Sequence, residues 1–106
     1  MPIDTAHEIT EIIRQLNAAN GYFDCERLVT NHIEKQLVNG AGFVQVKIYL
    51  RTVQEQLTAF NERGDGHINY SYAAAFVKLL ITTSYWYSWI KQNKLNPATN
   101  TREVYD

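Results

Sequence analysis

Histidine and cysteine are the residues of this chain best suited to acid–base, nucleophilic or metal chemistry. The three histidines, His7, His32 and His67, fall in different segments, and none has another histidine or a carboxylate at a familiar metal-ligand spacing. Cys25 precedes His32 by seven residues, which is about two helical turns and too far for direct contact. We therefore expect no metal site and no cysteine nucleophile, with Cys25 packed as a small apolar residue.

The acidic residues offer no second route to catalysis. Glu8 lies three residues before Glu11, and Glu55 lies seven before Glu62, and we expect all four carboxylates on helix surfaces rather than in an acid–base pair. The glycines at 40 and 42 lack the lysine and serine that complete a phosphate-binding loop. The sequence thus predicts a protein that is not an enzyme, has no catalytic residues and uses no cofactor.

The size and charge of the chain narrow its class. Its 106 residues, 45% hydrophobic and 20% charged, predict a single globular domain over residues 1–106. Ten Lys and Arg against eleven Asp and Glu give a net charge of −1, which provides no overall attraction to nucleic acid or to an acidic membrane. The single cysteine fits a reducing compartment, and the N-terminus has no signal-peptide pattern, so we expect a cytoplasmic protein.

The span from Ile68 to Ile90 is long enough to cross a bilayer, but its composition argues against this. Several polar residues interrupt it, and a central lysine such as Lys78 costs about 3 kcal/mol on insertion scales. A buried helix is the better interpretation, and we expect no membrane partner.

Four stretches place apolar residues at helical spacing. The first begins near residue 6, with Asp4 or Thr5 as its cap, and the second follows Asp24 and ends at the glycines 40 and 42. The third runs from residue 43 to about residue 60, and the fourth from about residue 70 to about residue 93. This order predicts an all-α fold, either a four-helix bundle or a paired helix-loop-helix domain.

The last predicted helix has two different faces. Residues that alternate four and three apart form the seam expected to pack on the other helices: Tyr72, Phe76, Leu79, Thr83, Trp86 and Ile90. A flanking seam widens this surface: Ala73, Val77, Leu80, Ser84 and Tyr87. The opposite stripe contains Lys78, Thr82, Tyr85 and Trp89.

The opposite stripe suggests a binding surface, because large exposed aromatics with a polar tip are typical interface anchors. We predict that Lys78, Thr82, Tyr85 and Trp89 bind a protein partner or a second copy of the chain. The favoured function is a small non-enzymatic protein–protein interaction domain, an adaptor, regulator or inhibitor-like protein. A covering of Tyr85 and Trp89 by the C-terminal tail or the first helix is the structural alternative.

The order of helices and loops is similar to a pair of calcium-binding EF-hands. The residues at loop positions one, three, five, six, eight and twelve would be Asn61, Arg63, Asp65, Gly66, Ile68 and Tyr72, and the stretch 20–24 looks like part of a first loop. Calcium needs several oxygen ligands and a final bidentate carboxylate, whereas Arg63 and Tyr72 stand at two ligand positions. The resemblance therefore implies paired helix-loop-helix units, and we predict no calcium binding at micromolar concentration.

The C-terminal third is similar to helix-turn-helix segments of excisionase and MerR-like proteins. The residues at like positions are Ala75, Leu79, Ile81, Thr82, Ser84, Tyr87, Trp89, Ile90, Lys91, Lys94 and Leu95. Leu80 replaces the turn glycine, and Tyr85 and Trp86 are bulky where a recognition helix presents small polar groups to base edges. The resemblance implies the alternative function, a DNA-binding accessory protein with a degenerate helix-turn-helix.

Overall fold

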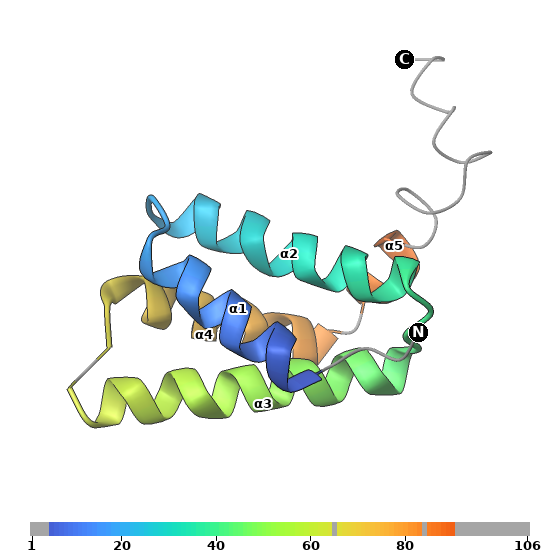
Figure 1. Ribbon diagram of the computed structural model, residues 1–106. Coiled ribbons are helices and arrows are strands. Elements are labelled where there is room, and N and C mark those ends of the chain that lie inside the picture. Colours follow the sequence, from blue (N-terminus) through green and yellow to red (C-terminus); the bar gives the residue numbers. More distant parts are fainter. Residues whose placement is uncertain (1–4, 65, 84, 91–106) are drawn as a thin grey trace, which may run out of the picture.

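The chain folds into helices that pack against one another (Figure 1). A computed structural model describes residues 5–64, 66–83 and 85–90 and, within the last range, the side chains of residues 86–88. The helices are α1 (Thr5–Asn17), α2 (Tyr22–Val38), α3 (Phe43–Glu62), α4 (Ile68–Thr83) and α5 (Tyr85–Ile90). No strand occurs among the described residues, so the predicted all-α bundle is confirmed.

The four long helices form a bundle in which each contacts the other three. In Figure 1, α2 runs along the top and α3 along the bottom, with α1 in front and α4 behind it. The interface between α3 and α4 is the most extensive, and the interface between α2 and α4 follows. The last long helix therefore shares surface with all the others, as the sequence predicts for its apolar stretch.

The start of α2 differs from the prediction that Asp24 caps it. The helix begins at Tyr22 because Gly21 adopts a φ of 92°, a left-handed conformation that glycine reaches without strain. Asp24 instead lies in the first turn, where its carboxylate accepts a hydrogen bond from the backbone amide of Asn20 at 2.9 Å and pairs with Arg27. Asp24 thus stabilises the N-terminal end of α2 from a position in its first turn.

The core is formed by apolar side chains from all four long helices, from Ala41 in the link between α2 and α3, and from Trp86 of α5. Fully or almost fully buried residues are Ile9, Ile12, Leu16, Cys25, Val29, Ile33, Ala41, Val46, Tyr49, Leu50, Val53, Leu57, Tyr70, Ala73, Val77 and Trp86. Cys25 is therefore a core residue, as predicted, and its thiol donates to the carbonyl of Asn69 at 3.7 Å. Burial raises the pKa of the Cys25 thiol, with a smaller effect from Asp24, which keeps the thiol protonated and unreactive.

The predicted core seam of the last helix is wrong in its register. Ala73 and Val77 are completely buried, whereas Leu79 is 53% exposed. The flanking seam is therefore the face that meets the bundle, and its small side chains allow α4 to lie close to its neighbours. Leu79 points away from the core.

The stretch predicted as the last helix holds two described helices, α4 and α5, while residues 84 and 91–93 lie outside the described part of the chain. Trp86 of α5 packs flat on Phe43, with ring centroids 5.6 Å apart. The indole nitrogen of Trp86 donates to the carbonyl of Leu80 at 2.9 Å, which satisfies one carbonyl near the helix end. The burial predicted for Trp86 is confirmed.

Neither family resemblance extends to the local geometry. The turn of a helix-turn-helix would fall at Leu80, but α4 is continuous from Ile68 to Thr83. In the EF-hand comparison Tyr72 would be the final loop ligand, but its ring lies edge-on to that of Tyr22, 5.7 Å away. Gly66 accommodates a close approach of Asn61, since a Cβ there would lie 3.3 Å from the Asn61 Cα.

The described part of the chain has neither a cluster of metal ligands nor a helix that could cross a membrane. No group of three or more His, Cys, Asp or Glu side chains could hold a metal ion there. None of the described helices is long and apolar enough to span a membrane.

Candidate functional site

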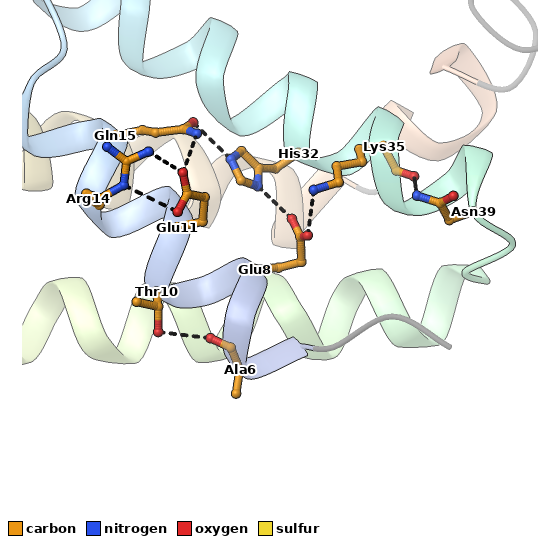
Figure 2. A network of polar contacts seen from close by, with 9 residues as sticks. All are labelled: Ala6, Glu8, Thr10, Glu11, Arg14, Gln15, His32, Lys35 and Asn39. Atoms are coloured by element: carbon orange, nitrogen blue, oxygen red, sulfur yellow. Dashed lines mark hydrogen bonds and ion pairs between the residues drawn. The ribbon is translucent and has the colours of Figure 1, made fainter. Parts of the chain in front are cut away.

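A polar cluster joins α1 to α2, and His32 lies at its centre. Figure 2 shows the His32 ring of α2 between two side chains of α1, Gln15 and Glu8. The ring Nδ1 lies 3.0 Å from Glu8 Oε2, and the ring Nε2 lies 3.0 Å from Gln15 Oε1. Lys35 Nζ donates to Glu8 Oε1 at 2.8 Å. We call these four residues, together with Glu11, the polar cluster.

Glu8 and His32 are both buried, with 5% and 6% of their surfaces exposed. The prediction that Glu8 lies on a helix surface is therefore wrong. Four residues separate Glu8 from Ile12, and residues four apart share one face of a helix, so the carboxylate points toward the bundle. Burial of an ionised carboxylate is costly unless it is paired, and the hydrogen bonds from Lys35 and His32 provide that pairing.

The environment changes the protonation of both buried groups. Burial alone would raise the pKa of Glu8, but hydrogen bonds from Lys35 and then His32 outweigh it, so the pKa is lowered from 4.5. Burial lowers the pKa of His32 from 6.5, and the hydrogen bond to Glu8 offsets this only in part. Glu8 is therefore an anion across the neutral range, and His32 resists taking a second proton.

The cluster continues along the surface of α1. Gln15 Nε2 donates to Glu11 Oε1 at 3.2 Å, and Arg14 pairs with the Glu11 carboxylate through both Nε and a terminal nitrogen. Hydrogen bonds from Arg14, and then from Gln15, lower the pKa of Glu11 to about 2. Glu11 therefore stays ionised and accepts hydrogen bonds at mildly acidic and neutral pH.

A pocket of about 570 Å³ opens over this cluster. Its lining comes from α1 and α2 and consists of His7, Glu11, Gln15, Leu28, Asn31, His32 and Lys35. His7 and His32 thus line the same pocket. Their spacing in the sequence does not indicate that they lie together. A carboxylate bound to a histidine can orient a general base, but no lining residue carries a hydroxyl or thiol that His32 could activate.

The spacing of residues within one helix cannot reveal the pairing of Glu8 with His32, but the position of each residue on its own helix bears on it. The two residues are 24 positions apart, and each falls at a core-facing position of its own amphipathic helix. An acidic and a basic side chain at core-facing positions indicate a buried pair only once the two helices are known to be neighbours, and the sequence does not supply that. His67, by contrast, is exposed, and its Nδ1 accepts a hydrogen bond from the backbone amide of Asn69 at 3.1 Å.

A second feature is an exposed apolar surface over α4 and the start of α2. Phe23 is 83% exposed, Ile68 57%, Leu79 53% and Tyr22 37%. The Tyr22 ring contacts the rings of both Phe23 and Tyr72 edge-on, with centroids 5.8 and 5.7 Å apart. We call these five residues the apolar band.

The residues of the band on α4 follow the spacing of a helix-packing seam. Ile68, Tyr72 and Leu79 of the band, together with Ala75, which lies between them, are spaced four, three and four positions apart, which places them on one side of the helix. The predicted binding residues Lys78 and Thr82 are exposed beside this seam, and the Thr82 hydroxyl donates to the Lys78 carbonyl at 2.8 Å. The side chains of the other two predicted binding residues, Tyr85 and Trp89, lie outside the described part of the chain.

Comparison with known proteins supplies no relative for this chain. No family model, no curated protein and no solved structure matches it. Function must therefore be argued from the two features above.

Proposed function

We propose that the chain is a non-enzymatic protein–protein interaction domain that binds a helix of its partner on the apolar band. The supporting observation is the exposure of Ile68 and Leu79 on α4 and of Phe23 at the start of α2, where the Tyr22 ring contacts both Phe23 and Tyr72 of α4. Fully burying an exposed side chain of this kind contributes about 1.5–3 kcal/mol, and the exposed part of each of these three side chains could be buried by a partner. Contiguous exposed apolar surface rimmed by polar residues is typical of binding sites.

The spacing within the band supports a helical partner. Apolar residues alternating four and three apart match the knobs that pack into a facing helix. Ala75 lies in the middle of the seam, and its small side chain would let a second helix approach closely. A groove-binding amphipathic helix is one of the recurrent modes of peptide recognition.

The charge of α4 favours an apolar partner surface over a charged one. Lys78 is the single charged residue between Ile68 and Thr83. An acidic partner would find little to pair with on this helix, whereas an apolar helix would bury the band without desolvating charge. The partner is then either another protein or a second copy of this chain.

A paired comparison of variants tests the proposal. In the band variant, Phe23→Ala and Leu79→Ala remove two exposed apolar side chains; in the control, Val44→Ala and Ile48→Ala remove two others that are 68% and 56% exposed on α3. Sedimentation equilibrium measures self-association, and quantitative mass spectrometry measures proteins that co-purify. We expect the band variant alone to lose a partner or a dimer.

Two outcomes would contradict the proposal. Equal loss of binding in the band variant and the control would show nonspecific adhesion of apolar surface. Salt-dependent retention of duplex DNA, with no partner protein lost in either variant, would favour the alternative of a DNA-binding accessory protein.

A further inference from the structure

The hydrogen bonds of the polar cluster have directions that its charges determine. Glu11 is ionised and can only accept, so the Gln15 group that faces it must be the amide NH₂. The Gln15 oxygen is then the atom that faces His32 Nε2 at 3.0 Å. On the other side of the ring, Glu8 is a carboxylate and also only accepts. Both nitrogens of His32 therefore face hydrogen-bond acceptors.

A ring that faces two acceptors needs two protons to bond to both. A neutral imidazole carries one N–H, and the stronger acceptor, the Glu8 carboxylate, takes it at Nδ1. The lone pair on Nε2 then faces the lone pairs of the Gln15 oxygen, which is repulsive. Gln15 cannot resolve this by turning its amide, because its oxygen would then face Glu11.

We propose that His32 is a proton-operated latch between α1 and α2. The doubly protonated ring bridges Glu8 and Gln15, and the singly protonated ring keeps Glu8 and releases the Gln15 side chain into the pocket above it. The latch closes when the pH falls and opens when it rises. The geometry of the structure, with both contacts at 3.0 Å, is that of the closed latch.

Charged and titratable groups surround the Glu8–His32 pair from three helices. α1 contributes Glu8 and Glu11, together with His7 on the pocket wall, and α2 contributes Lys35. α3 contributes Tyr49, which interacts electrostatically with Glu8. Glu8 and Glu11 favour the second proton on His32, whereas burial and Lys35 oppose it. The latch therefore closes below the ordinary pKa of histidine.

Nuclear magnetic resonance of the unmodified protein tests the latch without any variant. The ¹⁵N signals of the His32 ring report its protonation, and the side-chain NH₂ signals of Gln15 report the contact. We expect both to change with one shared midpoint as the pH is lowered from about 8 to about 4.5, the range in which histidine titrates in proteins. A His32 ring that never takes the second proton in this range, or a Gln15 amide that does not follow it, would overturn the proposal.

Two matched variants separate the latch from general effects on the pocket. Gln15→Leu removes the acceptor of the protonated ring, so the His32 midpoint should fall by roughly half a unit to one unit. Asn31→Leu removes the other amide of the pocket and should leave the midpoint unchanged, because the hydrogen-bond partners of the ring are Glu8 and Gln15. Equal midpoints in the Gln15 variant and the unmodified protein would contradict the latch.

Discussion

The hydroxyl of Tyr49 is buried and has no hydrogen-bond partner among the described residues. Burial, with a smaller effect of Glu8, raises the pKa of this phenol well above its ordinary value, so it is neutral. An unsatisfied buried hydroxyl costs about 1–3 kcal/mol relative to its solvated state. No hydrogen bond among the described residues offsets this cost. The ring of Tyr49 packs in the core.

Tyr49→Phe should therefore leave the protein at least as stable. We expect the free energy of unfolding to stay equal or to rise by up to about 1 kcal/mol, because the ring remains and the unpaired hydroxyl is removed. Urea denaturation followed by circular dichroism measures this. A loss of more than about 1 kcal/mol would show that the hydroxyl has a bonded partner in solution.

Asn69 is a buried side chain that joins α4 to the end of α1. Its Nδ2 donates to the carbonyls of Leu16 at 2.9 Å and Ala19 at 2.8 Å, and these carbonyls lie where α1 leaves its last turn. Asn69→Leu should lower the free energy of unfolding by about 1–3 kcal/mol, because it removes both hydrogen bonds from Asn69 Nδ2 to backbone carbonyls. Asn31→Leu on the exposed side of α2 is the matched control and should change stability by less than about 0.5 kcal/mol.

The pH dependence of stability follows from the lowered pKa values of His32 and Glu8. The unfolded chain protonates His32 more readily than the folded protein does, so stability falls as the pH drops through 6.5 toward the lower folded pKa. Glu8 contributes stability that is present above 4.5 and is lost as the pH falls through its lower folded pKa. Acid should therefore destabilise the protein in two steps.

His32→Gln should remove the first step and keep the second. Urea denaturation at a series of pH values measures both, and the slope of the unfolding free energy against pH near 6 is the decisive quantity. An unmodified protein that becomes more stable between about pH 7.5 and about pH 5.5 would contradict a lowered His32 pKa.

At the level of helices, α4 shows what sequence periodicity can and cannot predict. A helix here follows from the alanine run and the absence of Gly and Pro between Ile68 and Leu95. Its orientation does not follow, because apolar residues cover most of its circumference and several faces could be core. Tyr70 packing on Phe60 and the buried amide of Asn69 select the Ala73–Val77 face, and both contacts depend on residues outside α4.

Two substitutions on α4 distinguish its buried and exposed faces. Val77→Ala should cost about 1–3 kcal/mol of unfolding free energy, because it leaves a cavity beside completely buried neighbours. Leu79→Ala should cost less than about 1 kcal/mol, since that side chain is half exposed. Urea denaturation of both variants checks this, and a larger loss for Leu79→Ala would restore the register expected from the sequence.

For the whole molecule, the bundle could be predicted from the sequence and the candidate sites could not. The bounds of α1 to α3 agree with the predicted helices to within a few residues. Each of these helices has one apolar face, so its orientation toward the core also follows from the sequence. The Glu8–His32 pair and the apolar band each depend on which helices become neighbours. Periodicity within one helix does not contain that information.

The apolar band as a protein-binding surface is the central claim, and site-specific photo-crosslinking in expressing cells tests it most directly. A photoreactive phenylalanine analogue replaces Phe23 or Leu79 in the band and, as a control, Ile48 on α3, which is similarly exposed. Denaturing gels and mass spectrometry then identify the adducts, including an adduct of two copies of this chain. We predict one discrete adduct from both band positions and none from position 48. No adduct from the band, or the same adducts from all three positions, would contradict the claim.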